Sequence, residues 1–546
     1  MKSEFNLIDE PWIPCIDLKG EKVEYGILDT LLRAHNLREI HDDSPLVTVA
    51  IHRLLLAILY RVFEGPSDTN QWKGLYQYGS FSRDGALNNY FGKWHHRFFL
   101  FDESCPFMQV GKLDLNKYKI NGAVKEYNTD ALMRLAKEAP NKKGRVLFDH
   151  QMATELLDYE PNEIARMLIS AQSYAGTGIA RSGKVGKQKI EPKPCRFAPC
   201  VKGICLWLQG NNLFQTLLVN LIPSQFIAND LPPWEEHDIV QAAVLSWRKE
   251  VKFTGPVQRF APQSRLIRII NRHTMFFTNG LRTTTDTDID DPMKTYYREP
   301  VTKAYQPLEM SKDKASWRDA HTLFSLGASN VKTAASLNFF AQLEKGGVLD
   351  GGAGFRANVV GLATKQDKVL LWRHERLPVP VELLNNDSLV ERLRTLVEEA
   401  ESLNSELCKR AYMIARFYLL PGADQRQLSK HEKEEVRKIA EVIDPCPVYW
   451  LRLENYFLSL LENLPEDWDE AKDDWKPDDN QRATSDWRKC LKDEAEQSLK
   501  ESIRFLGTTV RAIQAVARVR IDFNDVDLKS QQQNRTQKKG RGGKRK

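Results

Sequence analysis

Cysteine is scarce in this chain, and none of it occurs in a C-x-x-C pair. The 546 residues contain eight cysteines, and the tightest group is Cys195, Cys200 and Cys205, at five-residue spacing. That spacing fits reduced structural thiols better than disulfides or a zinc knuckle. The cysteine pattern therefore predicts no bound metal and no cofactor.

Long apolar runs are also missing. No stretch of eighteen uncharged apolar residues occurs, and the start of the chain lacks the basic-then-apolar pattern of a signal peptide. A membrane-spanning helix needs about 20 consecutive apolar residues. We therefore expect a cytoplasmic protein that has no membrane partner.

Complete catalytic signatures are absent as well. The segment Gly178 to Val185 lacks only the final Ser or Thr of a Walker A loop, but that hydroxyl is the Mg²⁺ ligand. His41 and Asp42 match the dipeptide of metal-dependent phosphohydrolases, with His52 as a further candidate ligand, although such sites need more His and Asp ligands. We expect no enzyme, and a metal-dependent nuclease or phosphohydrolase remains the alternative.

The length and the pattern of apolar residues predict two domains. At 546 residues, 42% of them hydrophobic, the chain exceeds what one core usually fills. A boundary is expected near Leu377 to Pro380, between a mixed domain at 1–378 and an antiparallel helical bundle of the four-helix type at 379–525. The first bundle helix is indicated by apolar residues at three- and four-residue steps: Leu389, Leu393, Leu396, Ala400, Leu403 and Leu407. A similar apolar stripe from Val436 to Leu461 and a third from Trp487 to Val510 indicate further helices.

The region before the boundary combines helix and strand patterns. Residues 44–63 read as a buried helix that begins at Ser44 and Pro45, and residues 161–175 as another. Runs at 203–208 and 368–372 are β-rich and predict antiparallel sheet. The predicted fold class is therefore α+β, a large mixed domain followed by the bundle.

The positive charge is concentrated at the end of the chain. Residues 529–546 hold eight Lys or Arg and no acid, so the formal charge of +6 falls to about −2 without them. We expect a disordered basic tail at 526–546. Such a tail either solubilises the protein or binds phosphate backbones without reading sequence.

The first residues point to a family. The run Phe5-Asn-Leu-Ile-Asp-Glu-Pro-Trp-Ile-Pro14 resembles the opening of CasA, the large subunit of the type I-E CRISPR complex Cascade. Similar segments follow in the family's order to about residue 520. This resemblance implies a subunit that binds double-stranded DNA, recognises the protospacer-adjacent motif (PAM) through the minor groove and helps to start strand separation and R-loop formation. It implies as partners the other Cascade subunits, crRNA and a recruited helicase-nuclease.

Four segments would carry this role. Residues 176–189 combine four glycines with four cations, which suits close approach to a phosphate or a narrow groove, and they resemble the family's glycine-rich PAM loop. A plain surface loop is the alternative. The DNA-contact candidates here are Gly176, Gly178, Arg181, Gly183 and Lys184.

The second segment, residues 361–368, reads as a polar turn between two apolar runs, hence a hairpin. It resembles the family loop that carries a glutamine wedge, which implies Gln366 as the wedge with Thr364 and Lys365 beside it. An inserted amide can stand in for a base edge and offset part of the unstacking cost of a few kcal/mol.

The other two segments are less specific. Near the family's lysine finger, Lys294, Arg298 and Lys303 are all candidates, and a surface ion pair is the alternative. Phe148 and His150 resemble part of a mobile DNA-contacting loop, where a buried Phe beside a helix-capping Asp149 is equally plausible. A purely structural ribonucleoprotein subunit remains a further alternative.

Overall fold

The computed structural model describes most of the chain. Described residues are 4–115, 117–120, 123–126, 130–135, 157–176, 181–191, 197–236, 252–280, 291–312, 314–326, 330–349, 354–365, 368–422 and 427–528. The chain divides into two compact units, the first formed by residues 1–316 and 325–377 and the second by residues 317–324 and 378–546. Mixed helix and strand in the first unit and helices in the second confirm the predicted α+β class.

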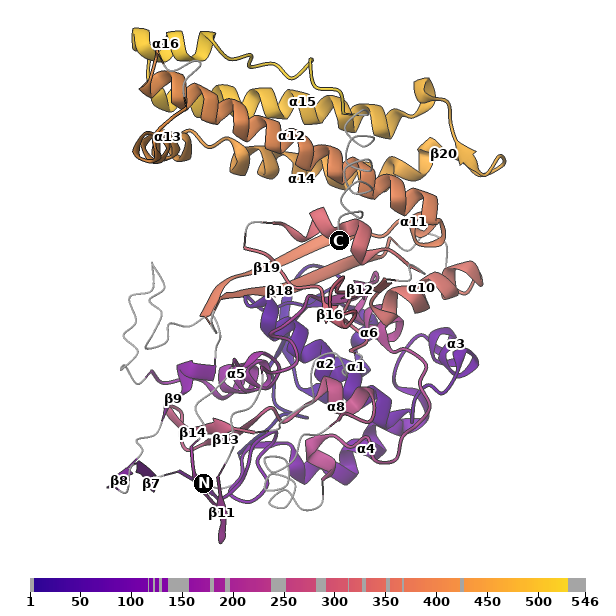
Figure 1. Cartoon of the computed structure of the whole chain (residues 1–546). Coiled ribbons are helices and arrows are strands. Elements are labelled where there is room, and N and C mark those ends of the chain that lie inside the picture. Colours follow the sequence, from indigo (N-terminus) through magenta and orange to yellow (C-terminus); the bar gives the residue numbers. More distant parts are fainter. Residues whose placement is uncertain are drawn as a thin grey trace. The chain divides into compact units, whose positions relative to one another are not determined.

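One buried helix, α2 (Pro45–Val62), forms the centre of the first unit. The Ser44 hydroxyl accepts a hydrogen bond from the Val47 amide, and Pro45 occupies the first turn, so the helix begins as the sequence predicted. Its composition would allow it to span a membrane, but 89% of its apolar window is buried inside the protein. Helices α5, α6 and α8 pack against it, which makes it the core helix of this unit (Figure 1).

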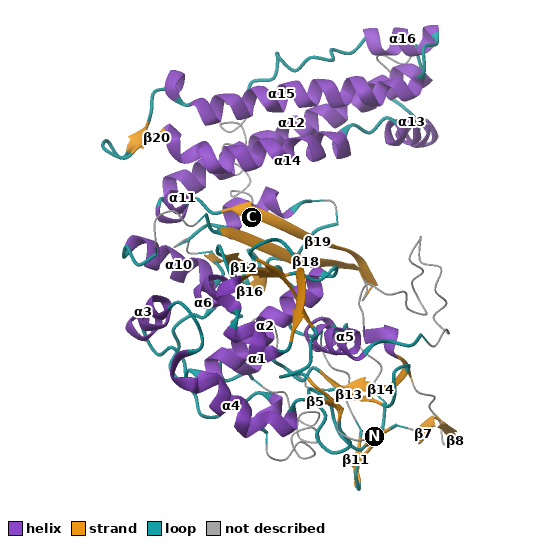
Figure 2. Cartoon of the chain, turned by 180° about the vertical axis from the view of Figure 1, so that it is seen from behind, coloured by secondary structure: helices purple, strands orange, loops and turns teal. Residues whose placement is uncertain are grey.

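Around α2 lie short helices and small antiparallel sheets (Figure 2). The other helices are α1 (Ile27–Leu32), α3 (Thr69–Tyr78), α4 (Ala86–Trp94), α5 (Pro161–Tyr174), α6 (Leu213–Asn220), α8 (Pro256–Phe260) and α10 (Ala335–Lys345). Two sheets line the region discussed below, with strand orders β3-β2-β4 and β12-β18-β19. Their strands are β2 (Ile13–Asp17), β3 (Lys22–Tyr25), β4 (Leu37–Ile40), β12 (Cys205–Gln209), β18 (Arg356–Lys365) and β19 (Lys368–Pro378).

Three further three-stranded sheets carry surface loops, with orders β11-β10-β6, β13-β14-β9 and β16-β15-β17. Their strands are β6 (Leu113–Asp114), β9 (Asp130–Ala131), β10 (Gly183–Val185), β11 (Gln188–Ile190), β13 (Arg265–Ile269), β14 (Thr274–Asn279), β15 (Tyr296–Arg298), β16 (Tyr305–Pro307) and β17 (Val331–Lys332). The remaining pairs are β1 (Glu4–Asn6) with β5 (Phe99–Phe101) and β7 (Lys117–Ile120) with β8 (Ala123–Glu126).

Three long helices build the second unit, and successive ones reverse direction (Figure 1). They are α12 (Asp387–Leu419), α14 (Cys446–Asn463) and α15 (Arg482–Ile503), with the shorter α11 (Val381–Asn385), α13 (Lys430–Val442) and α16 (Val510–Ala517). A hairpin of β20 (Trp468–Asp469) and β21 (Asp474–Trp475) lies between α14 and α15 in the sequence. All six predicted apolar positions of α12 are buried.

The second unit departs from the sequence prediction in three places. The apolar stripe expected to run from Val436 to Leu461 belongs to two helices, α13 and α14, and Val510 is exposed on α16 rather than continuing the stripe of α15. The disordered tail was predicted to begin too early, at residue 526, because Val526 and Leu528 are buried. Residues 529–546 lie outside the described ranges.

A short segment from the middle of the sequence completes this helical core. Trp317, in the 3-10 turn Ser316–Asp319 that leads into α9 (Ala320–Leu323), lies 4.6 Å from Phe457 and 5.8 Å from Trp450 between ring centroids. The Arg318 guanidinium lies 3.7 Å from the Trp450 ring centroid and donates to the Glu401 carboxylate. These contacts explain why residues 317–324 belong to the second unit, which the sequence did not indicate.

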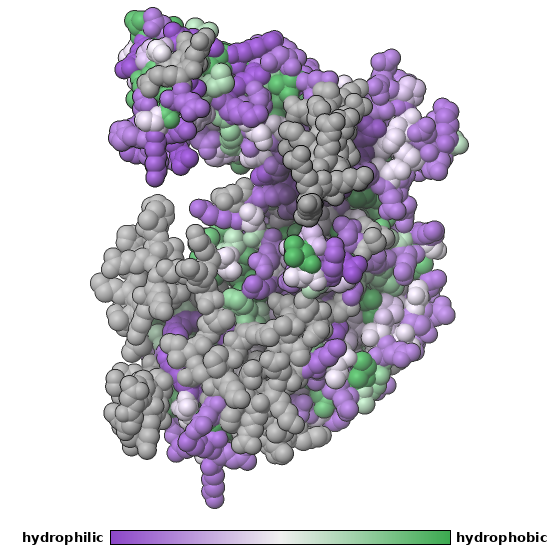
Figure 3. All heavy atoms as spheres, viewed as in Figure 1, coloured by the Kyte–Doolittle hydropathy of each residue, from purple (hydrophilic) through white to green (hydrophobic). Residues whose placement is uncertain are grey.

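Most of the helical unit's surface on the face shown in Figure 3 is hydrophilic. Hydrophobic atoms gather at the end formed by α16, where Val510 and Ile513 are exposed. Two cationic side chains at this end bond to backbone: Arg511 donates to the Leu419 carbonyl and Arg518 to the Pro421 carbonyl. Arg410 is buried and ion-paired with Asp525.

Candidate nucleic-acid interface

A two-stranded ribbon, β10 and β11, presents lysines from the glycine-rich segment. Val185 and Ile190 point into a small apolar core, while Lys184, Lys187 and Lys189 are exposed. Gly186 adopts φ +58° in the connecting turn, a conformation that favours glycine. The ribbon therefore displays a row of cations on a fixed support, although Lys184 lies 3.3 Å from the Asp114 carboxylate.

The glycine at 183 has a packing role. A Cβ there would lie 2.3 Å from the Asp114 carbonyl oxygen, so any side chain would collide with the backbone of β6. The close pairing of β10 with β6 thus explains why glycine is needed at position 183, and no ligand contact is required to explain it. Gly176 accepts a hydrogen bond on its carbonyl from Arg265, and Gly178 lies outside the described residues.

Arg181 is held by protein groups. Its guanidinium binds both carboxylate oxygens of Asp130, at 2.5 and 3.1 Å, and its backbone amide donates to the Thr278 hydroxyl. A bidentate pair of this kind orients the side chain strongly. Arg181 consequently anchors the start of the β10–β11 segment in this structure.

A second cationic turn connects β15 and β16. Arg298 and Lys303 are exposed there, and the Arg298 Nε donates to the Lys303 carbonyl at 3.0 Å. Lys303 has φ +59°, an unusual conformation for a side chain other than Gly, Asn or Asp. The exposed aromatic ring of Tyr297 lies on the same hairpin. Cations beside an aromatic ring suit contact with nucleic acid.

Lys294 does not share this surface. It is only 3% exposed, and its ammonium donates to the carbonyl oxygens of Pro199 at 2.5 Å and Lys202 at 2.7 Å. The expected DNA contact is therefore wrong for Lys294 as this structure places it, because the Lys294 ammonium is buried and already donates to two carbonyl groups of the protein. Arg298 and Lys303 remain candidates.

A buried ion pair that sequence reasoning missed fixes the segment before β15. The Arg53 guanidinium on α2 donates to both carboxylate oxygens of Asp291, at 3.1 and 2.8 Å, and neither side chain is exposed. Burial alone would raise the pKa of Asp291, but the charges of Arg53 and Lys294 outweigh it and lower that pKa. No local motif signals this pair, since its members lie 238 positions apart.

Other predicted DNA contacts are only partly described. Thr364 is half-buried near the end of β18, and the side chain of Lys365 and all of Gln366 lie outside the described residues. The strands on either side, β18 and β19, are neighbours in one sheet, so the predicted hairpin is confirmed. Phe148 and His150 also lie outside the described ranges.

The alternative metal site is not assembled. His41, Asp42 and His52 line one cavity, but Asp42 accepts from the Ser44 amide and lies 3.5 Å from Arg166, and His52 Nδ1 donates to the Thr48 carbonyl. Among the described residues, the one group of three or more ligand-type side chains close enough to share an ion is Cys408, Asp444 and Cys446.

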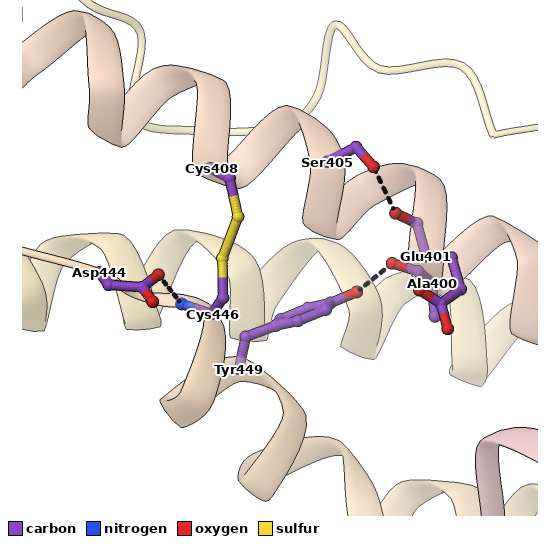
Figure 4. The surroundings of a disulfide bond; sticks show 7 residues. All are labelled: Ala400, Glu401, Ser405, Cys408, Asp444, Cys446 and Tyr449. Carbon is purple, nitrogen blue, oxygen red and sulfur yellow. Dashed lines mark hydrogen bonds between the residues drawn. A yellow bond between two sulfur atoms is a disulfide. The ribbon is translucent and has the colours of Figure 1, made fainter. Parts of the chain in front are cut away.

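Two members of that group, Cys408 and Cys446, are bonded covalently to each other. The sulfurs of Cys408 on α12 and Cys446 on α14 form a disulfide, with Cα atoms 6.6 Å apart (Figure 4). Asp444 accepts from the Cys446 amide at 3.0 Å. The bond links two helices of the bundle. Of the three cysteines predicted to be reduced, Cys200 and Cys205 are free and buried, and Cys195 lies outside the described residues.

The cavity lined by His52 has a volume of about 580 Å³. A chain of hydrogen bonds runs through its wall: His374 Nε2 donates to Asn358 at 2.7 Å, Asn358 donates to Gln209 at 2.9 Å, and Gln209 donates to Glu39 at 2.8 Å. Glu39 also accepts from Arg376 at 2.8 Å and from Arg38 at 3.2 Å. In this series of hydrogen bonds each residue donates to the next, and the series ends on the Glu39 carboxylate.

The same arrangement shifts the pKa values of the titratable side chains that line the cavity. Burial on its own would raise the pKa of Glu39, but the Arg376 charge and the hydrogen bonds from Gln209 and Arg38 lower it. Burial lowers the pKa of His52 to about 4, and burial together with the Arg376 charge lowers that of His374 to about 4. Both histidines are therefore neutral at pH 7. Sequence reasoning named His52 only as a candidate metal ligand and missed Glu39 and His374, because these residues come from separate elements.

Comparison with known proteins identifies the family. The family model of the CRISPR-associated protein Cse1 matches residues 6–498. The curated CRISPR-associated protein CasA/Cse1 of Thermus thermophilus is 30% identical over 533 residues, which is 95% of this chain and 96% of the relative. The chain belongs to the CasA/Cse1 family.

Solved Cse1 structures share the fold. The crystal structure of Thermus thermophilus CasA has a TM-score of 0.74 at 28% identity and covers 94% of this chain and 97% of its own. Cse1 from Acidimicrobium ferrooxidans has a TM-score of 0.71 at 22% identity, covering 94% and 95%. A chain of a CRISPR RNA-guided surveillance complex has a TM-score of 0.69 at 17% identity, covering 94% and 98%. The expected family is thereby confirmed.

Proposed function

We propose that this chain is the large subunit of a CRISPR surveillance complex of the Cascade type and recognises the PAM of double-stranded target DNA. The observation that carries the proposal is family membership over 95% of the chain. A chain with the same fold belongs to a structure described as a CRISPR RNA-guided surveillance complex. The proposed partners are the other Cascade subunits, crRNA, target DNA and a recruited helicase-nuclease.

In this proposal two cationic turns contact the duplex near the PAM. Lys184, on the β10–β11 ribbon, and Arg298 and Lys303, on the β15–β16 turn, would neutralise phosphates or approach minor-groove edges. Both turns rise from small sheets whose inner faces are packed, so the side chains are presented on rigid supports. Lys294 takes no part, since its ammonium is bound inside the protein.

The β18–β19 hairpin would then start strand separation through Gln366. Both strands are long, ten and eleven residues, and the sheet continues into β12, which gives the connecting residues a firm base. A crRNA held by other subunits would pair with the opened target strand, so that base pairing reads the sequence and this chain reads only the PAM. This is binding chemistry and needs no catalytic group.

The proposal is tested in the reconstituted complex with Gln366→Ala and Lys303→Ala chains. Gln366→Ala should leave initial PAM binding in place but slow R-loop formation, because the unstacking step loses its inserted group. Lys303→Ala should weaken duplex binding across PAM sequences and flatten its salt dependence, by about one unit of slope per lost phosphate contact. Lys409→Ala, an exposed cation on α12 paired with Glu406, is the matched control. An unchanged R-loop rate in Gln366→Ala, together with unchanged duplex affinity and salt dependence in Lys303→Ala, would leave a structural role.

A further inference from the structure

The 580 Å³ cavity of the first unit has no part in PAM reading as proposed above, yet it is built like a ligand site. Its volume falls within the range of about 300–1,000 Å³ that small-ligand pockets show. Strands β4, β12, β18 and β19 and helix α2 line it. Its side chains are linked by the hydrogen-bond chain from His374 to Glu39, so their orientation is fixed before any ligand arrives.

Aromatic rings form one wall. The Trp207 ring lies between two histidines, 5.3 Å from His52 and 5.8 Å from His374 by ring centroids, and it is nearly parallel to His374. Trp372, two residues before His374 on β19, lies on the same face of that strand and is 40% exposed. Because Trp207 is only 3% exposed, the ring on which a ligand can stack is that of Trp372.

The charges of the wall argue against an anion. Three carboxylates, those of Glu39, Asp42 and Asp43, face two guanidinium groups, those of Arg38 and Arg376. Both guanidinium groups donate to Glu39, so a phosphate would meet no surplus of positive charge. A neutral ligand is favoured, and the flat aromatic wall favours a planar one.

Hydrogen-bonding groups suit the edge of a heterocycle. His52 donates through Nδ1 to the Thr48 carbonyl, and His374 donates through Nε2 to Asn358, so the second ring nitrogen of each is an acceptor when the ring is neutral. The amide groups of Asn358 and Gln209 each keep a second N–H beyond the bond described here. Acceptors and donors side by side against an aromatic wall match the edge and face of a nucleobase.

The rim leads towards the hairpin proposed to open the duplex. On β19, Leu370 and Trp372 share the face that continues into the cavity at His374, and both are unusually exposed for their size. From Lys368, where β19 begins, to Trp372 is four residues, about 13 Å along the strand. A strand separated at this hairpin would meet Trp372 within a few nucleotides.

We propose that this cavity binds a single unpaired nucleobase of the opened DNA, which stacks on the exposed ring of Trp372 at the rim and turns its polar edge towards the hydrogen-bonding groups of the wall. The ligand is a neutral planar base on a DNA strand, recognised by stacking and by its polar edge. The inference rests on the proposed function for the source of the unpaired strand, and the binding of a base to this chain is measurable without that function.

The test uses the purified full chain and a short single-stranded DNA that carries one 2-aminopurine. Stacking on tryptophan quenches this base, so binding should quench its fluorescence. Trp372→Ala should weaken the affinity, measured by the fluorescence anisotropy of an end-labelled strand, roughly 5- to 100-fold, the range for loss of one base–aromatic stack. Trp372→Phe should restore most of it, and Tyr78→Ala, which removes an exposed ring on α3, should leave it unchanged.

Competitors define the ligand. An oligonucleotide with an abasic site in place of 2-aminopurine should compete poorly, and free deoxyadenosine monophosphate should compete only at much higher concentration. Equal competition by the abasic strand would refute base binding, and equal competition by the monophosphate would refute a strand-borne ligand. Tighter binding of the matching RNA than of the DNA would refute the proposed source.

A second measurement separates this inference from the proposed function. The reconstituted complex containing Trp372→Ala is assayed for PAM-selective binding of duplex DNA. Retained selectivity together with lost 2-aminopurine quenching supports the cavity as a base site that acts after PAM recognition. Absent selectivity in the wild-type complex would contradict the proposed function alone, whereas absent quenching by the wild-type chain would contradict the cavity inference alone.

Discussion

The buried pair Arg53–Asp291 gives the sharpest prediction about stability. In the variant Arg53→Met, the Asp291 carboxylate keeps its burial but loses two hydrogen bonds and the main opposing charge. The Arg259 carbonyl also loses its bond from Arg53 at 2.6 Å. Breaking a buried pair from one side costs about 3–5 kcal/mol, a large part of the roughly 5–15 kcal/mol that usually stabilises a folded domain.

The measurement must report on the first unit, because a chain of two units does not unfold in one step. Hydrogen exchange of α2 peptides under mild urea measures the opening free energy of the helix that carries Arg53. Arg33→Met is the control, since Arg33 lies 3.8 Å from Asp29 and both side chains are more than half exposed. That variant should cost less than about 1 kcal/mol.

A double variant and a pH series complete this test. The double variant Arg53→Met with Asp291→Asn should lower the opening free energy of α2 by less than the sum of the two single changes. The difference should be at least about 1 kcal/mol, because no unpaired buried charge is left. The pKa of Asp291 is lowered in the folded state, so the pair stabilises fully above about pH 4 and its contribution is lost as pH falls further. Additive costs, or an Arg53→Met effect no larger than that of Arg33→Met, would refute this account.

Two other changes test the packing of the first unit. Because the pKa of His52 is about 4 when folded and about 6.5 when unfolded, protons bind the unfolded state first and the stability of the first unit should fall by about 2 kcal/mol from pH 7 to 5. The opening free energy of α2, measured by hydrogen exchange, should depend less on pH in His52→Gln. Gly183→Ala should raise exchange in β10 and β6, because its Cβ would collide with the Asp114 carbonyl, whereas Gly92→Ala, with open space around it, should not.

Local patterns predicted elements whose causes are local. Ser44 and Pro45 specify the start of α2, and the apolar spacing of α12 specifies its buried face. The division of the chain falls after Leu377 because the helical pattern begins there. The inclusion of Trp317 in the helical core escaped prediction, since aromatic contacts between distant segments leave no periodic trace.

The candidate site shows the same limit. The lysine-rich ribbon and the turn that carries Lys303 could be found from composition, because exposed cations and glycines mark surface loops. Lys294 has the same local chemistry as Lys303 but is buried against two carbonyl groups supplied by residues about ninety positions away. The cavity arises only when strands from different parts of the chain meet, and the sequence suggested a metal site for His41 and His52 rather than a ligand cavity.

The most direct test of the central claim compares the reconstituted complex with and without this chain. Both are bound, at one fixed salt concentration, to a pool of target duplexes randomised only at the PAM, and the bound fraction is sequenced. Enrichment of particular PAM sequences only when the chain is present is the result we predict. Equal enrichment without the chain would contradict its role as the PAM reader.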